Sequence, residues 1–199
     1  MQCLPSAAAA CVAATPVCGD DHACRACEAH DECASGACLP DGSCAAETSV
    51  AYVLATGTGT TCTRAAPCPL LRSAIAVAKP IIKVGAAGAA NDTGTVVIDG
   101  KTVTILAEAG AKLDRDGDGP ILEVRSAGAD VAIYDLTISG ATGMSGGDGI
   151  QLTPNGGAPK LSLTRAKVVQ NQGSGISATG GTLTLSTAPR KLVAIRPPP

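Results

Sequence analysis

The sequence contains no phenylalanine and no tryptophan, and its aromatic residues are Tyr52 and Tyr134. Yet 45% of its 199 residues are hydrophobic, so any core must be built from alanine, valine, isoleucine and leucine. These side chains fill space in small increments, and a repetitive stack suits them better than an irregular core. The length allows one medium domain plus a small one.

Charge and long apolar runs are also scarce. The formal net charge is −2 and there is no cluster of lysine and arginine, which argues against nucleic acid or an anionic membrane as a partner. No apolar run approaches the roughly 18 residues of a transmembrane segment. The alanine-rich start carries Cys3 and Cys11 and lacks a preceding basic stretch, so it is a poor signal peptide, and we expect an exported precursor to be longer than this chain.

Cysteine, in contrast, is abundant. Eight of the ten cysteines fall between Cys3 and Cys44, among short polar, turn-forming residues that cannot form a core. An even, dense set of cysteines predicts a disulfide-rich module at residues 1–46 and an oxidising location, extracellular or in the cell envelope. Of the possible pairings the spacing favours Cys27–Cys38 and Cys33–Cys44, and Cys62–Cys68 is expected to staple a later loop.

A zinc site is the alternative to disulfides in the module at residues 1–46. The residues that could bind the ion are His22, Cys24, Cys27, His30 and Cys33. Structural zinc sites show two ligand pairs separated by a loop long enough to fold around the metal. Here cysteines recur every three to six residues without such a gap. The spacing therefore favours disulfides.

A repeat of apolar pairs dominates the rest of the chain. The four apolar positions of "VAIYDLTIS", which are Val131, Ile133, Leu136 and Ile138, recur thirty residues later in "LSLTRAKVV". The first pair also recurs at Val103/Ile105 and Leu183/Leu185. A second family of alternating pairs lies between them, at Val96/Ile98, Leu122/Val124, Ile150/Leu152 and Ile176/Ala178. Each unit is predicted to be two short strands separated by glycine-rich corners.

Stacked units of this kind predict an all-β fold, a right-handed parallel β-helix of about four rungs over residues 81–186, in which equivalent side chains lie on top of one another. The alternative is an antiparallel β-sandwich, but sandwich strands have no reason to repeat one pattern at a constant offset. Residues 187–199 form a proline-rich tail that breaks the pattern, and the chain is interpreted as a fragment of a longer β-helix.

Residues 47–80 are predicted to cap the first rung. A strand at Tyr52 to Ala55 leads to a Gly/Thr loop, and a short helix opens at Pro69 and ends at Pro80. Leu71, Ile75 and Ala78 would form its apolar stripe.

Two resemblances follow from these segments. The stretch from Val50 to Ser186 resembles right-handed β-helix proteins of the pectate-lyase-like group, which implies the fold but no particular activity. "CRACEAHDECASGACLPDGSC" resembles short cysteine-rich modules ahead of repeat domains in bacterial envelope proteins, which implies a spacer or binding module.

Catalysis finds little support. Enzymes of the resembled group use clustered acids with calcium and a base, or aspartates with a histidine, but no histidine follows His30. Asp135 and Arg165, thirty residues apart, should stack as a surface ion pair, and both should point outward, as should Glu123 and Lys167. We therefore expect a non-catalytic secreted or cell-surface protein that binds a polysaccharide or another surface component. A degenerate polysaccharide lyase is the alternative, and the oligomeric state is open.

One motif suggests a metal. Asp114, Asp116 and Asp118 alternate before Gly119, like the first half of a calcium loop, and a sharp turn could bring their carboxylates together. The second half of the segment does not match a calcium loop, because Arg125 occupies the position where a bidentate glutamate is expected. Calcium is the one cofactor the sequence suggests, and a plain solvated corner is the alternative.

Overall fold

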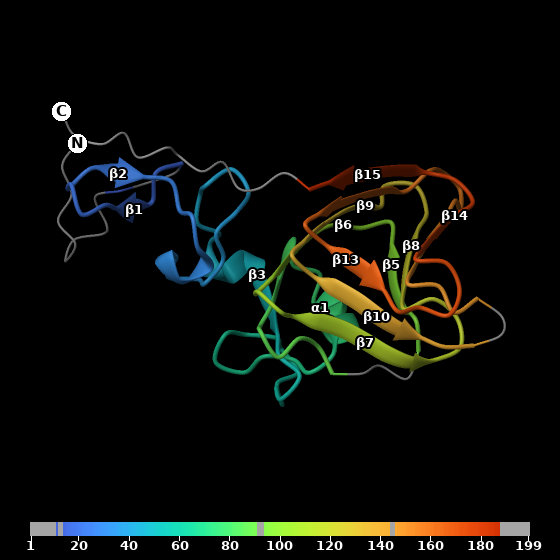
Figure 1. The fold of residues 1–199 in the computed structure, drawn as a ribbon. Helices are drawn as coiled ribbons and strands as arrows, with labels where there is room; N and C mark the ends of the chain where they lie inside the picture. The colour runs from blue at the N-terminus through green and yellow to red at the C-terminus, as the bar shows by residue number, and fades with distance from the viewer. Residues whose placement is uncertain (1–10, 12–13, 91–93, 144–145, 188–199) are drawn as a thin grey trace.

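A parallel β-solenoid of about four turns forms most of the protein (Figure 1). The computed structural model describes residue 11 and residues 14–90, 94–143 and 146–187. Each full turn contributes one strand to each of three parallel sheets, and the corners between the strands are short polar turns. This confirms the predicted fold class.

The three sheets take their strands in chain order along the solenoid. The first sheet contains β3 (Val50–Val53), β4 (Ile81–Val84), β6 (Thr102–Ala107), β9 (Asp130–Tyr134), β12 (Lys160–Thr164) and β15 (Thr182–Ser186). The second contains β5 (Val96–Asp99), β8 (Leu122–Arg125), β11 (Ile150–Thr153) and β14 (Ile176–Ala178). The third contains β7 (Lys112–Gly117), β10 (Thr137–Ala141) and β13 (Lys167–Val169).

The register of these strands follows the sequence repeat. Ile133 pairs with Ile105 on one side and with Leu163 on the other. In the second sheet, Ile150 pairs with Leu122 and Ile176. The stacked aliphatic residues are almost all inaccessible to solvent and form one continuous core. Burial of such columns is the main stabilising contribution that this composition allows.

Each turn contains three strands rather than the two predicted. The segment "VAIYDLTIS" forms both β9 and β10, because the chain bends at Asp135, whose φ is 62°. Arg165 occupies the same place one turn later, with φ 53°. The sequence carried a signal of this bend, because Ile133 and Leu136 are three positions apart and interrupt the alternation of the strand.

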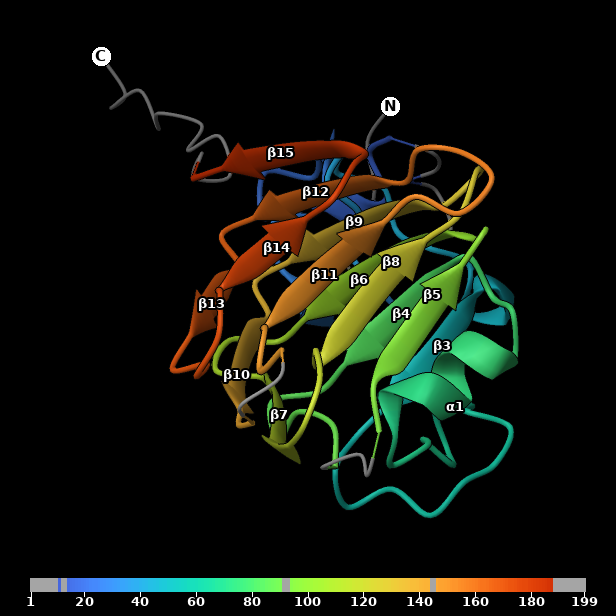
Figure 2. The same ribbon diagram turned by 90° about the vertical axis from the view of Figure 1, so that its right-hand side faces the viewer.

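A short helix closes the N-terminal end of the solenoid. α1 (Leu71–Ala76) buries Leu71, Ala74 and Ile75 against the first turn, and Figure 2 shows it at the opposite end of the stack from β15. The predicted stripe was wrong at Ala78. That residue is exposed with φ 56°, beyond the end of the helix, and Ala74 takes the buried position instead.

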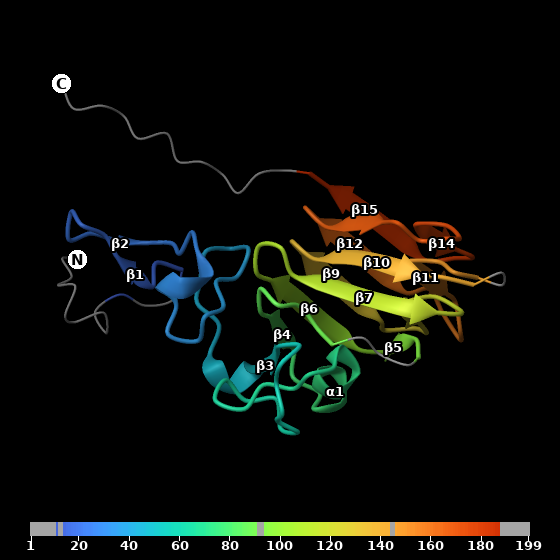
Figure 3. The ribbon, with the colours of Figure 1, turned by 60° about the horizontal axis from the view of Figure 1, so that its bottom comes forward.

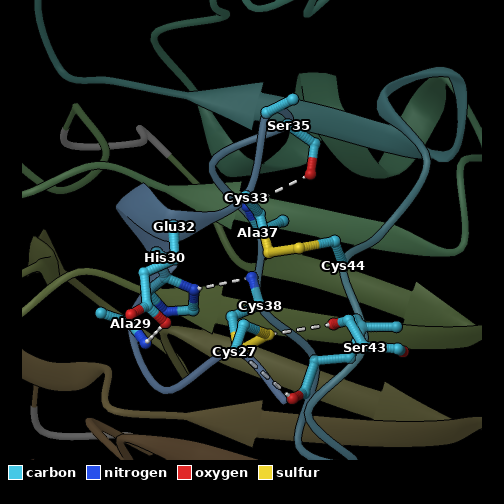
Figure 4. The surroundings of a disulfide bond; sticks show 12 residues. Cys27, Ala29, His30, Glu32, Cys33, Ser35, Ala37, Cys38, Ser43 and Cys44 are labelled. Carbon is cyan, nitrogen blue, oxygen red and sulfur yellow. Dashed lines mark hydrogen bonds between the residues drawn. A yellow bond between two sulfur atoms is a disulfide. The ribbon is translucent and has the colours of Figure 1, made fainter. Parts of the chain in front are cut away.

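The N-terminal module contains little regular structure. Its described residues include β1 (Val17–Cys18), β2 (Cys24–Arg25) and the short 3-10 helix η2 (His30–Glu32), and a further 3-10 helix, η3 (Glu47–Ser49), follows at the start of the cap. Disulfides join Cys11 to Cys24, Cys27 to Cys38 and Cys33 to Cys44, and a fourth joins Cys62 to Cys68 in the cap. No described cysteine is free. Figure 4 shows the two central bridges packed together beside His30.

The module packs against the outer face of the first sheet, beside the solenoid (Figure 3). A small apolar cluster joins Ala37 and Ala45 of the module to Tyr52 and Leu106 of the solenoid, with Tyr134 packed against it. The Tyr52 hydroxyl donates a hydrogen bond to the Ser35 carbonyl at 2.7 Å. In the described part of the chain no helix is long and apolar enough to cross a membrane.

Candidate functional site

A cleft of about 610 Å³ lies where the module meets the solenoid, and we call it the seam cleft. Its volume lies within the range of small-molecule binding sites. The polar side chains along its walls come from both parts of the chain: Glu28, His30 and Asp31 from the module, and Arg64, Glu108, Asp135 and Arg165 from the solenoid.

The solenoid wall carries a rigid ion pair. Arg165 donates from Nε to Asp135 Oδ1 and from Nη2 to Asp135 Oδ2, both at 2.6 Å, so the two planar groups meet in a parallel fork. The hydrogen bonds from the guanidinium to Asp135 raise the pKa of Arg165 above its ordinary value, against the opposing effect of burial. The stacking of Asp135 and Arg165 that the sequence predicted is confirmed, and their left-handed corners present the fork to the cleft.

The module wall is held by Glu32, which is not itself among the residues that line the cleft. Its Oε2 accepts hydrogen bonds from the backbone N–H groups of Glu28 at 2.6 Å and Ala29 at 3.1 Å. Its Oε1 accepts one from Arg25 Nη2 at 2.5 Å. The Arg25 guanidinium, together with the two backbone donors, lowers the pKa of Glu32 to about 2. Glu32 therefore fixes the loop that presents Glu28, His30 and Asp31.

His30 and Arg64 link the cleft to the disulfide framework. The Cys38 N–H donates to His30 Nδ1 at 3.2 Å, which fixes the imidazole ring on the module (Figure 4). Arg64 extends from the cap loop and donates to the Ala34 carbonyl of the module. Both contacts orient a polar side chain at the seam.

Glu108 connects the seam cleft to a smaller neighbouring cavity. That cavity has a volume of about 230 Å³, and Arg64 and Glu108 line both. Glu108 forms an ion pair with the buried Lys83, with Nζ and Oε1 2.7 Å apart. Glu108 therefore places a carboxylate in the cleft, and the Lys83 ammonium beneath it balances the charge of that carboxylate.

The three aspartates of the suggested calcium loop lie elsewhere, at the end of the third sheet. Asp114 and Asp116 belong to the extended strand β7 and not to the sharp turn on which the calcium hypothesis depended, while Asp118 follows the strand and is exposed. Asp114 Oδ1 accepts a hydrogen bond from Ser139 at 3.3 Å.

Arg115 occupies the centre of this corner. Its side chain is buried, and its Nη2 donates to the carbonyls of Gly117, Asp118 and Gly119 at 3.3, 2.5 and 2.7 Å. The backbone oxygens of the bend thus already coordinate a cationic group that belongs to the chain. Calcium binding by Asp114, Asp116 and Asp118 stays a prediction.

The proposed zinc ligands are divided among the disulfides. Cys24, Cys27 and Cys33 belong to three different bridges. Cys27, Cys33 and Cys38 form the one described group of side chains close enough to share a metal ion, and all three sulfurs are bonded to other sulfurs. The disulfide interpretation therefore accounts for this cluster.

Sequence reasoning did not identify the seam cleft as a site. His30, Arg64 and Glu108 lie in three different segments, and only the docking of the module on the first sheet brings them together. The two tyrosines come closest to a sequence signal for this docking. A tyrosine has an apolar ring and a polar hydroxyl, and this combination commonly mediates contacts between domains, as the Tyr52 hydroxyl and the Tyr134 ring do here. Comparison of the chain with protein families, with curated proteins and with solved structures found no match.

Proposed function

We propose that this chain is a non-catalytic, secreted or cell-surface β-solenoid protein that binds a short glycan in the seam cleft. The observation that carries the proposal is the rigid Asp135–Arg165 fork in a polar cleft of ligand size. The disulfides are consistent with an oxidising compartment, and the module's resemblance to bacterial envelope proteins suggests the cell surface.

Fixed polar groups suit a ligand made of hydroxyls. A carboxylate offers about four acceptor positions and a guanidinium five donors, so each keeps hydrogen-bonding capacity after forming the fork. Because Asp135 and Arg165 hold each other in place, little side-chain entropy would be lost when a sugar binds. A glycan could therefore exchange its hydration for hydrogen bonds already arranged in the cleft.

The charge of the cleft favours a neutral or amino-bearing glycan over a uronate. Four carboxylates line it, those of Glu28, Asp31, Glu108 and Asp135. Against them stand the two guanidinium groups of Arg64 and Arg165 and the Lys83 ammonium beneath Glu108, which leaves one acid in excess. An excess of acids repels a polymer of carboxylated sugars. This argues against the lyase alternative, whose substrates in the resembled group are uronates.

Screening the full chain against a panel of neutral, amino-bearing and uronic-acid glycans, followed by calorimetry on the best binder, tests the proposal. Asp135→Asn should weaken binding about tenfold, the loss expected for one charge-assisted hydrogen-bond pair. Asp99→Asn is the matched control. It breaks a similar stacked pair with Arg125, at 3.0 Å, on a corner outside the cleft, and should leave affinity unchanged.

Two results would contradict the proposal. Equal losses for Asp135→Asn and Asp99→Asn would show that the effect is not local to the cleft. Release of unsaturated products from a uronic-acid polymer, followed by ultraviolet absorbance, would support the lyase alternative instead.

A further inference from the structure

The last turn of the solenoid exposes leucines in positions that are core elsewhere. Among the described residues, the exposed large hydrophobic side chains are Val169, Leu183 and Leu185, at 43%, 36% and 64% exposure. Leu183 pairs with Leu161 and Leu185 with Leu163, which are 1% and 4% exposed. The exposed leucines thus continue the buried columns of the first sheet, with nothing described above them.

No described residue pairs with the backbone of β15 along the same edge. Thr182 N–H donates to the Pro159 carbonyl at 2.9 Å, and the Ser186 carbonyl accepts from Arg165 N–H at 3.0 Å. In a parallel ladder alternate residues bond to opposite neighbours. The N–H and C=O groups of Leu183 and Leu185 therefore face away from β12, toward the uncovered side.

This edge lacks the features that usually prevent pairing between molecules. Edge strands are commonly protected by charged residues, proline or bulges. β15 reads Thr-Leu-Thr-Leu-Ser and β14 reads Ile-Ser-Ala, and neither contains such a residue. Their pairing with β12 and β11 is regular through the last residue of each register.

The sequence of β15 is self-complementary. When two copies pair antiparallel about Thr184, Leu183 of each lies opposite Leu185 of the other, and Thr182 lies opposite Ser186. The open backbone groups of Leu183 and Leu185 then meet as hydrogen-bonded pairs, while Thr184 meets its own copy in a non-hydrogen-bonded pair. Leucines face leucines on the core side and hydroxyls face hydroxyls on the other.

The opposite end of the solenoid excludes a head-to-tail stack. α1 covers the first turn with Leu71, Ala74 and Ile75. The outer edge of β3 is bonded to the cap loop, where the Tyr52 N–H donates to the Cys62 carbonyl and the Cys68 N–H donates to the Tyr52 carbonyl. The described residues therefore leave no equivalent open edge there for β15 to join. We propose that two copies of this chain associate through their last turns, with β15 pairing antiparallel to β15 of the partner across a two-fold axis at Thr184. The first sheet would then run continuously through the dimer.

Disulfide trapping of the full chain tests the geometry. Thr184→Cys should cross-link to itself, because Cα atoms in a non-hydrogen-bonded antiparallel pair are about 4.5 Å apart, within disulfide reach. Ser162→Cys is the control, since Ser162 pairs with Thr184 one strand inward and its copy would lie about 14 Å away, three strand spacings. We expect about tenfold more covalent dimer from Thr184→Cys than from Ser162→Cys under mild oxidation, because only the first pair is within reach.

Sedimentation of the full chain and of two variants completes the test. The unmodified chain should show a concentration-dependent dimer, and Leu185→Lys should be monomeric because it places two charges in the shared core. A second variant, ending at Thr187, should dimerise as the full chain does. A full chain that stays monomeric, or that dimerises only once residues 188–199 are removed, would overturn the proposal, the latter by showing that its own tail covers the edge.

Discussion

Glu32 shows how a single side chain shapes the candidate site without lining it. Its carboxylate receives the guanidinium of Arg25 and two backbone N–H groups, and its pKa falls to about 2 from an ordinary value of 4.5. A carboxyl whose pKa is lower in the folded protein stabilises it above the unfolded pKa. This contribution is complete above pH 4.5 and is lost as the pH falls toward 2.

Glu32→Gln should therefore reduce the free energy of unfolding by about 0.5–1 kcal/mol at pH 7, a small value because Arg25 is exposed. Denaturant titrations at several pH values measure it. The difference between the two proteins should persist down to about pH 4.5 and disappear near pH 2. A difference that does not change with pH would mean that the carboxylate charge is not responsible.

At the scale of the strand, stability depends on the aliphatic columns. Ile133 lies in the middle of one, fully buried between Ile105 and Leu163. Neighbouring turns hold its surroundings on both sides, so a cavity made there cannot easily collapse.

Ile133→Ala should cost about 3 kcal/mol, within the range for deletion of a buried isoleucine side chain. Ser162→Ala, on the outward face of the adjacent strand, should change stability by less than about 0.5 kcal/mol. Chemical denaturation compares the two. Similar small effects from both would contradict the stacked core.

The sequence predicted the strands well where the aliphatic repeat was regular and poorly at the bends. The registers of β6, β9 and β12 could be read from the recurrence of residues such as Val131 and Leu161. The bend at Asp135 was missed although the interval from Ile133 to Leu136 interrupts the alternation, because a left-handed aspartate or arginine has no strong signature of its own in a single sequence. The length of α1 was overestimated for a similar reason, since Ala78 is a good helix former that adopts φ 56°.

At the scale of the whole molecule, the two parts are stabilised differently. The solenoid has a continuous apolar core, while the buried residues of the module are chiefly its cysteines and a few alanines. The docking of the module on the solenoid brings Glu28 and Arg165 into one cleft. No local pattern in the sequence indicates that these two residues lie close together. The seam cleft was consequently not predictable from the sequence.

Reduction of the disulfides should unfold the module and leave the solenoid folded, because each bridge contributes about 2–4 kcal/mol to a segment with little core of its own. Trypsin digestion followed by mass spectrometry would then show new cleavage at Arg25, while the far-ultraviolet β-sheet signal persists. If the β-sheet signal is lost at the same reductant concentration at which cleavage at Arg25 appears, the folding of the solenoid depends on the module.

The scarcity of aromatic residues has a practical consequence. Tyr52 and Tyr134, the two tyrosines of the chain, both pack in the apolar cluster between module and first sheet. Ultraviolet fluorescence of the unlabelled protein therefore originates entirely at this junction. The emission would report separation of the two parts in real time and would be insensitive to events within the aliphatic core.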